Sequence, residues 1–380
     1  MSRFQLLVSY ALIMSSLANS QTKLKASHAE YHAWKEAVIL TNGVAEVIVV
    51  PAIGRVIQFH FAGEEPVLWE NRALDGKPVA KDEKNWTNFG GDKSWPSPQA
   101  EWPKLIGRGW PPPFTFDQVS MTATIRDSVV ALVTPVDPQY GIRERREIRL
   151  DDSLPVMQIT TTYEKVTGDP VKVGIGVITQ LRDPQRAFMV LPEKSQFPKG
   201  YVHLQFDLPE NLRVKDGLVA LTRGRKIESQ IGSDASTLIW MDEKYVLRID
   251  SPRVEGAEYA DQGSSAIIYT GADPFPYVEL ETFGPLSTMK VGDKIQRTNT
   301  YTLSRRTEKD SESEAKKQRR SWLDSSAMED GRPRPSAESM SYAVSRTNGL
   351  GRNDSKNCCA YLRQLTRSGT SATDRRGYSS

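Results

Sequence analysis

Cysteine and histidine are scarce in this sequence of 380 residues, and neither sign of charge dominates. The two cysteines, Cys358 and Cys359, are adjacent and near the C-terminus, so no disulfide can cross-link the body. A net charge of +3 is small for this length and argues against a broad basic surface for nucleic acid. Zinc-ligand spacings, phosphate-binding glycine loops and nucleophile elbows are lacking. We therefore expect no metal, no cofactor and no nucleic-acid partner.

Only one apolar run stands near a terminus. Arg3 precedes the run, which covers residues 4–14, and Ala18 and Ser20 then supply the small residues that a signal peptidase requires. The run is shorter than the ~20 apolar residues of a membrane-spanning helix. The pattern predicts a signal peptide at residues 1–20, a secreted or periplasmic protein, and no stable membrane anchor.

Short apolar runs separated by turn signals fill the chain from residue 37 to residue 304, without helical periodicity between them. This spacing is typical of an all-β sandwich or barrel. The predicted strands cover residues 37–40, 47–50, 56–61, 119–125, 129–135, 142–150, 156–163, 171–181, 201–206, 218–222, 237–241, 245–249, 266–269, 277–283 and 296–303. In the strand at 56–61, His60 alternates out of the apolar set, and we expect it to face solvent.

Residues 86–116 hold half of the eight tryptophans together with many prolines and glycines. Proline removes a ladder donor and fixes its own backbone angle, which excludes a helix and a central strand. We expect a long ordered loop, since disorder would leave the indole rings in water. Indole rings stack on the C–H faces of sugars, and the polar residues between them could bind hydroxyls. Any single tryptophan could equally serve packing alone.

The composition changes after residue 305 to serine, charged residues and glycine, with almost no apolar period. Such a segment cannot bury enough surface to order itself. We therefore expect a lead-in at residues 21–36, one β domain at 37–304, and a disordered polar tail at 305–380, which could also be a reading-frame artefact.

Three stretches carry a family resemblance: residues 51–59 with 68–71 following, residues 90–96, and residues 277–282 with the turn at 291–293. Their order and spacing resemble the galactose mutarotase-like supersandwich of aldose 1-epimerases. Within that fold, the chain is similar to the DUF4380 family of exported bacterial proteins. The resemblance covers residues 37–304 and implies a large antiparallel β-sandwich with a sugar pocket.

A mutarotase needs a base for the C1 hydroxyl and an acid for the ring oxygen. The resemblance implies that Glu281 is the base. Glu279, two residues earlier, projects on the same strand face and could add a second carboxylate. Where the family places histidines, this sequence has Asp92, Lys93 and Gln180. Lys93 could act as the acid only if burial lowered its pKa substantially.

The expected site combines these residues with parts of the tryptophan-rich stretch, and Asp92 and Glu281 should converge on one concave face. Arg182, at a strand end, could bind an anionic sugar through its guanidinium or could be a surface residue. The expected lining is Asp92, Lys93, Trp95, Glu101, Trp102, Trp110, Gln180, Arg182, Glu279 and Glu281.

Three functions fit this pattern. The first is an exported carbohydrate-binding or carbohydrate-active protein that binds a sugar without turnover. The second is an aldose 1-epimerase with Glu281 as base and Lys93 or a water as acid. The third is a non-catalytic module of a cell-envelope assembly, in which the tryptophan-rich stretch contacts a protein. The sequence does not define the sugar or the oligomeric state.

Overall fold

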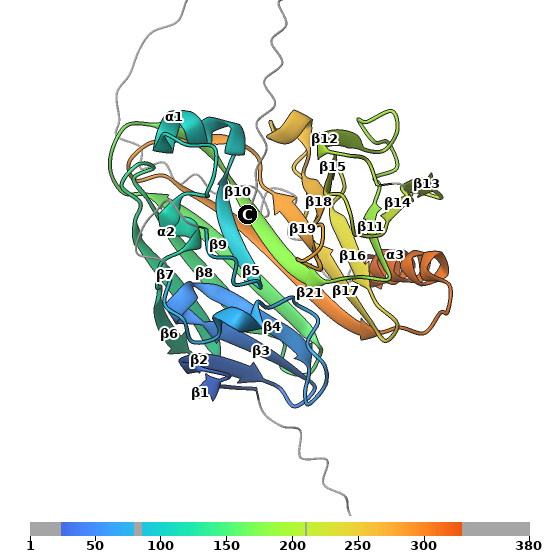
Figure 1. Cartoon of the computed structure of the whole chain (residues 1–380), viewed down its shortest axis with the longest axis horizontal. Coiled ribbons are helices and arrows are strands. Elements are labelled where there is room, and N and C mark those ends of the chain that lie inside the picture. The colour runs from blue at the N-terminus through green and yellow to red at the C-terminus, as the bar shows by residue number, and fades with distance from the viewer. Residues whose placement is uncertain (1–23, 80–85, 210, 329–380) are drawn as a thin grey trace, which may run out of the picture. The chain divides into compact units, whose positions relative to one another are not determined.

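A computed structural model describes residues 24–79, 86–209 and 211–328. The expected signal peptide at residues 1–20 lies outside these ranges, as does the C-terminal tail beyond residue 328. The described residues form two large antiparallel sheets (Figure 1). The prediction of an all-β fold, a large antiparallel β-sandwich, is confirmed.

The first sheet has 11 strands. In spatial order they are β1 (Lys25–Tyr31), β2 (Trp34–Thr41), β3 (Ala45–Val50), β4 (Arg55–Phe61), β5 (Asp92–Ser97), β10 (Val171–Arg182), β19 (Tyr277–Phe283), β18 (Ala266–Thr270), β15 (Ser229–Ser233) and β12 (Val202–Phe206), with β20 (Ser287–Met289) paired to β10.

The second sheet has 10 strands. Their spatial order is β13 (Arg213–Lys215), β14 (Leu218–Leu221), β11 (Arg186–Val190), β16 (Thr237–Met241), β17 (Tyr245–Asp250), β21 (Lys294–Arg305), β9 (Val156–Lys165), β8 (Ile142–Leu150), β7 (Val129–Val136) and β6 (Thr122–Arg126). The helices are α1 (Trp102–Ile106), α2 (Phe114–Asp117) and α3 (Ser311–Met328).

The main hydrophobic core lies between the sheets, because it joins side chains from both, such as Val47 and Leu280 of the first sheet and Leu132 and Trp240 of the second. Strand β8 shows the expected alternation, with every second side chain buried. Burial of one face of each sheet is the main driving force for this architecture.

The turn between β2 and β3 follows from the sequence. The Asn42 side-chain oxygen accepts hydrogen bonds from the backbone amides of Val44 and Ala45 at 2.9 and 2.8 Å. Gly43 has a φ of 82°, a conformation that glycine adopts without steric cost. An Asn-Gly pair therefore sets the register of this hairpin.

Strand β5 corrects the expectation that residues 86–116 form only a loop. It lies between β4 and β10, yet it pairs with β4 only through Val56 and Asp92 and with β10 over six residues. Pro96 lies beyond the single β4 contact, so its missing N–H faces an unpaired edge and costs no ladder hydrogen bond. The rest of the stretch holds two short helices, α1 and α2.

His60 is also placed differently from the expectation, because it is buried. The segment that follows β4 covers this face of the strand: the Gln58 side-chain amide donates to the Leu68 carbonyl oxygen at 2.9 Å. One ring nitrogen of His60 lies 2.8 Å from the Phe61 carbonyl oxygen. His60 is thus buried although it alternates with apolar residues, because a later segment of the chain covers its face of the sheet.

The ordered region extends beyond the expected limits of 37–304 at both ends. Strand β1 and the start of β2 occupy the expected lead-in. Helix α3 occupies part of the expected disordered tail, and its Ala315 packs against Phe188, Ile239 and Met241 on the outer face of the second sheet. Besides this contact, the Arg248 guanidinium donates to the Gln318 carbonyl oxygen at 3.0 Å, and a tertiary hydrogen bond of this kind leaves no hydrophobic periodicity in the sequence.

None of the helices in the described residues is long and apolar enough to cross a membrane.

Candidate functional site

The register of β5, β10 and β19 brings several expected site residues onto one face of the first sheet. Ile178 of β10 lies directly between Lys93 of β5 and Glu281 of β19, and Gln180 is opposite Glu279. Directly opposed residues of antiparallel strands project on the same face. Lys93, Gln180, Glu279 and Glu281 therefore lie together on the outer face, away from the second sheet.

Two glycines fix the start of β5. Gly90 and Gly91 have φ angles of 91° and 73°. A Cβ on Gly90 would lie 2.1 Å from the Trp69 carbonyl oxygen, and one on Gly91 would lie 2.5 Å from that of Val56. Only glycine allows both the backbone conformation and this close approach, so the Gly90-Gly91 pair positions Lys93 on the outer face of the sheet.

Lys93 is a buried cation beside an acidic residue. Its Nζ lies 3.7 Å from Glu279 Oε1 and 5.0 Å from the ring centroid of Trp95, and it makes no hydrogen bond. Burial lowers the pKa of Lys93 to about 8, with the Glu279 carboxylate opposing the shift. The condition for Lys93 to exchange a proton near neutral pH is thus met.

Both glutamates of β19 are buried, at 7% and 5% exposure for Glu279 and Glu281. Burial raises the pKa of Glu279, while the Lys93 ammonium lowers it. Burial also raises the pKa of Glu281 well above its ordinary value, and the charge of Glu279 raises it further. Two carboxyl groups with different proton affinities therefore share one site.

The tryptophan-rich stretch is fastened to this site by a carboxylate that sequence reasoning missed. Asp117 of α2 accepts hydrogen bonds from the indole nitrogens of Trp95 and Trp86, each at 2.8 Å, and from the Arg55 guanidinium at 2.9 Å. Asp117 and Arg55 are fully buried. The charge of Arg55 lowers the pKa of both Lys93 and Glu279, and the charge of Asp117 raises both. Only a lone aspartate after a proline run hinted at this role.

The tryptophans of this stretch differ in exposure. Trp95 is 8% exposed, and its ring meets those of Trp102 and Trp110 edge to face at 6.0 and 5.8 Å. Trp102 is fully buried and donates to the Pro96 carbonyl oxygen at 2.9 Å. Trp110 is 41% exposed. Glu101 is a surface residue that pairs with Lys104 at 3.6 Å.

Asp92 does not line the site, contrary to expectation. Its carboxylate lies between the two sheets, where it pairs with Arg146 of β8 and accepts hydrogen bonds at 2.6 Å from Thr179 and Tyr301. Asp92 and Glu281 therefore lie on opposite faces of the first sheet. Side chains alternate along a strand, so the neighbouring Lys93 takes the place expected for Asp92.

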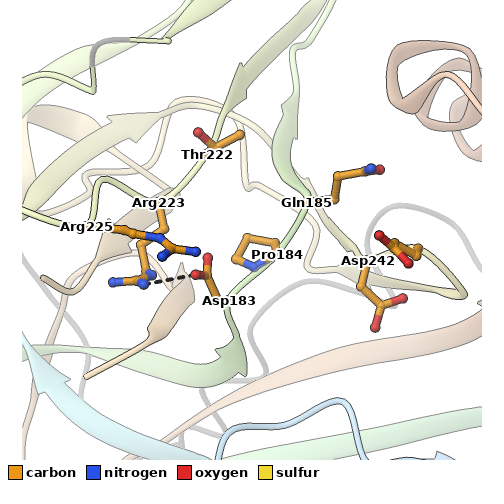
Figure 2. A pocket seen from close by; sticks show the side chains of 8 residues that line it. Asp183, Pro184, Gln185, Thr222, Arg223, Arg225 and Asp242 are labelled. Atoms are coloured by element: carbon orange, nitrogen blue, oxygen red, sulfur yellow. Dashed lines mark hydrogen bonds and ion pairs between the residues drawn. The ribbon is translucent and has the colours of Figure 1, made fainter. Parts of the chain in front are cut away.

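Arg182 also lies apart from the glutamates. Its guanidinium pairs at 2.9 Å with Asp242, in the turn between β16 and β17. Next to it is a surface cavity of about 410 Å³, in which Arg223 pairs with Asp183 at 2.9 Å (Figure 2). A second cavity of about 860 Å³ is lined by residues of the 191–201 segment and of 212–217. Neither cavity is lined by Lys93, Glu279 or Glu281.

Among residues 24–79, 86–209 and 211–328, no three histidine, cysteine or acidic side chains are grouped so that they could hold a metal ion. What the site offers chemically is a lysine and two carboxyl groups with shifted pKa values beside indole rings.

Known proteins of similar structure share little sequence with this chain. No family model and no curated protein matches the chain. Similar solved structures include a candidate aldose 1-epimerase from Escherichia coli K12, with 15% identity, coverage of 70% of this chain and 98% of that chain, and a TM-score of 0.46. A galactose mutarotase-like protein from Lactobacillus casei has 10% identity, coverage of 70% and 100%, and a TM-score of 0.45. A galactose mutarotase-like protein from Clostridium acetobutylicum has 10% identity, coverage of 75% of this chain and 99% of that chain, and a TM-score of 0.46.

Proposed function

We propose that this chain is an exported carbohydrate-binding protein whose sugar site is the outer face of β5, β10 and β19. We also propose that it is a member of the DUF4380 family. The observation that carries the proposal is the meeting of Lys93, Glu279 and Glu281 beside Trp95. An indole can stack on a sugar face, while an ammonium and carboxyl groups can bind its hydroxyls.

The three expected groups contribute differently to binding. Lys93 can donate hydrogen bonds, since its ammonium has no hydrogen-bonding partner. Glu281, with its raised pKa, can donate as an acid or accept as a carboxylate. Gln180, fully buried between β5 and β19, can orient a hydroxyl but cannot deliver a proton.

Calorimetric titration with glucose, galactose and their uronic acids tests this proposal. Lys93→Met and Glu281→Gln should each weaken binding of the bound sugar about tenfold or more, since each removes a hydrogen bond to a charged or strongly polar group. The matched control is Glu258→Gln, an exposed carboxylate that pairs with Lys172 at 2.6 Å, and it should leave affinity unchanged. Equal affinities for all variants would place the sugar elsewhere.

A second candidate is an aldose 1-epimerase, favoured by the opposite pKa shifts of Lys93 and Glu281. Glu281 as carboxylate would take the proton of the C1 hydroxyl while the Lys93 ammonium protonates the ring oxygen. The bond from C1 to the ring oxygen would break, and the open-chain aldehyde would close on its other face.

Optical rotation separates the two candidates. Freshly dissolved α-glucose, α-galactose and uronic acids should reach equilibrium faster with an epimerase, and Glu281→Gln should abolish the acceleration. Binding without any acceleration would support the carbohydrate-binding function and exclude the epimerase. The remaining candidate, a module of a cell-envelope assembly, gains support if the folded protein binds none of these sugars.

A further inference from the structure

A row of four aromatic rings crosses the outer face of the first sheet beside the candidate site. The ring centroids of Trp69 and Tyr277 are 4.7 Å apart, those of Tyr277 and Tyr269 are 6.2 Å apart, and those of Tyr269 and Phe206 are 5.9 Å apart. We call Trp69, Tyr277, Tyr269 and Phe206 the aromatic row. Its members come from four separate segments of the chain, so no sequence motif reveals it.

The aromatic row starts within the candidate site. Tyr277 precedes Glu279 by two residues on β19, and Tyr269 of β18 is directly opposite Glu279. Both tyrosines therefore share a face with Glu279. Burial raises the pKa of the Tyr277 hydroxyl, and the nearby Asn88 and Gln180 side chains oppose this shift. Gln180, directly opposite Glu279, thus lies close to both the first ring and a carboxyl group.

Exposure along the aromatic row increases from Tyr277 to Phe206. Tyr277 is 5% exposed, Tyr269 is partly buried, and Phe206 at the end of β12 is 50% exposed. Phe206 has a φ of 61°, which is a strained conformation for an aromatic residue, and its carbonyl oxygen lies 2.7 Å from a ring nitrogen of His203. Such strain is common at binding sites, where the surrounding structure maintains it.

Polar side chains lie along the aromatic row. Gln230 of β15 is directly opposite Tyr269, and its amide lies 3.5 Å from Glu281. Gln205 of β12 is opposite Gln230. Burial raises the pKa of Tyr269, and the charge of the nearby Glu228 raises it further. Flat rings flanked by amides and a carboxylate offer both stacking faces and hydroxyl partners.

We propose that the aromatic row binds the successive units of an oligosaccharide, whose terminal unit occupies the site of Lys93, Glu279 and Glu281. This inference rests on the proposed function and specifies its ligand as a glycan chain instead of a free monosaccharide. Neighbouring ring centroids are 4.7 to 6.2 Å apart, so the rings contact one another in a continuous row, and its outermost ring, Phe206, is the most exposed. An aromatic residue that only packed would not need to stand half exposed on a strained backbone.

Titration calorimetry with saccharides of one to four units, in the gluco, galacto and manno series, tests the inference. Affinity should rise about tenfold or more from one unit to three, because each added unit gains a stacking contact. Phe206→Ala should remove most of this gain and leave monosaccharide affinity unchanged. Tyr269→Phe retains the ring and should keep most of the gain.

The matched control is Leu154→Ala, which removes an exposed apolar side chain of similar size from the turn between β8 and β9 of the other sheet. This variant should change neither the affinity for monosaccharides nor the affinity for longer saccharides. Monosaccharide binding that does not strengthen with chain length would overturn the inference and leave the proposed function intact. Failure of every saccharide to bind would remove both, whereas a gain with length that survives Phe206→Ala would also refute the aromatic row.

Discussion

Asp117 is the residue whose replacement tests the architecture of the site most directly. Its buried carboxylate accepts hydrogen bonds from Trp86, Trp95 and Arg55 and thereby ties α2 to β5 and β4. Asp117→Ala would leave the Arg55 guanidinium buried without its counter-charge, a change that costs about 3–5 kcal/mol. The two indole donors would also lose their acceptors, at about 1–3 kcal/mol for each group left unsatisfied.

These contributions overlap, because the Asp117 backbone carbonyl also accepts from Arg55, at 3.3 Å, and would persist in the variant. We therefore expect Asp117→Ala to lower the free energy of unfolding by roughly 4 kcal/mol. Urea denaturation monitored by circular dichroism gives this value, and tryptophan fluorescence reports the release of the two indoles. Glu258→Ala, which breaks an exposed ion pair, is the control and should be within error of the unmodified protein.

A double-mutant cycle separates the ion pair from the indole bonds. Asp117→Asn keeps the side-chain shape but removes the charge, and combining it with Arg55→Met removes the unpaired cation as well. The combination should be more stable than Asp117→Asn alone by about 1 kcal/mol or more. A loss below about 1 kcal/mol for Asp117→Ala would refute the idea that this carboxylate holds the stretch in place.

Three further outcomes follow from buried groups. Burial raises the folded-state pKa of Glu144 to about 7, so its stabilising contribution is present below the unfolded pKa near 4.5 and is lost as pH rises through 7. Glu144→Gln should therefore raise the free energy of unfolding by roughly 2 kcal/mol at pH 8 and not at pH 4.5; equal gains at both would contradict the assignment. Sugar affinity should fall as pH rises through about 8, where Lys93 loses its proton, and a Lys93→Arg variant that still binds should lack this step. Ala315→Arg should overpack the contact of α3 and speed hydrogen exchange of residues 311–319 while the sheets stay protected.

The sequence alone determined the fold class, because strand formation there is local. Alternating apolar residues in β9, and the Asn42-Gly43 turn between β2 and β3, specify strands and hairpins through contacts near in sequence. The pairing of Glu279 with Glu281 on one face follows from the same alternation. These patterns are enough to predict a large antiparallel sandwich.

Only the tertiary structure decided which face of each strand became the site. Asp92 and Lys93 are adjacent and both polar, and the contact of Asp92 with Arg146 and Tyr301 of the other sheet turns Lys93 outward. Asp117, Arg55 and the aromatic row are assembled from segments far apart in the chain, which no local pattern records. Residue types and periodicity fix the strands, but packing between the sheets fixes the direction of each side chain.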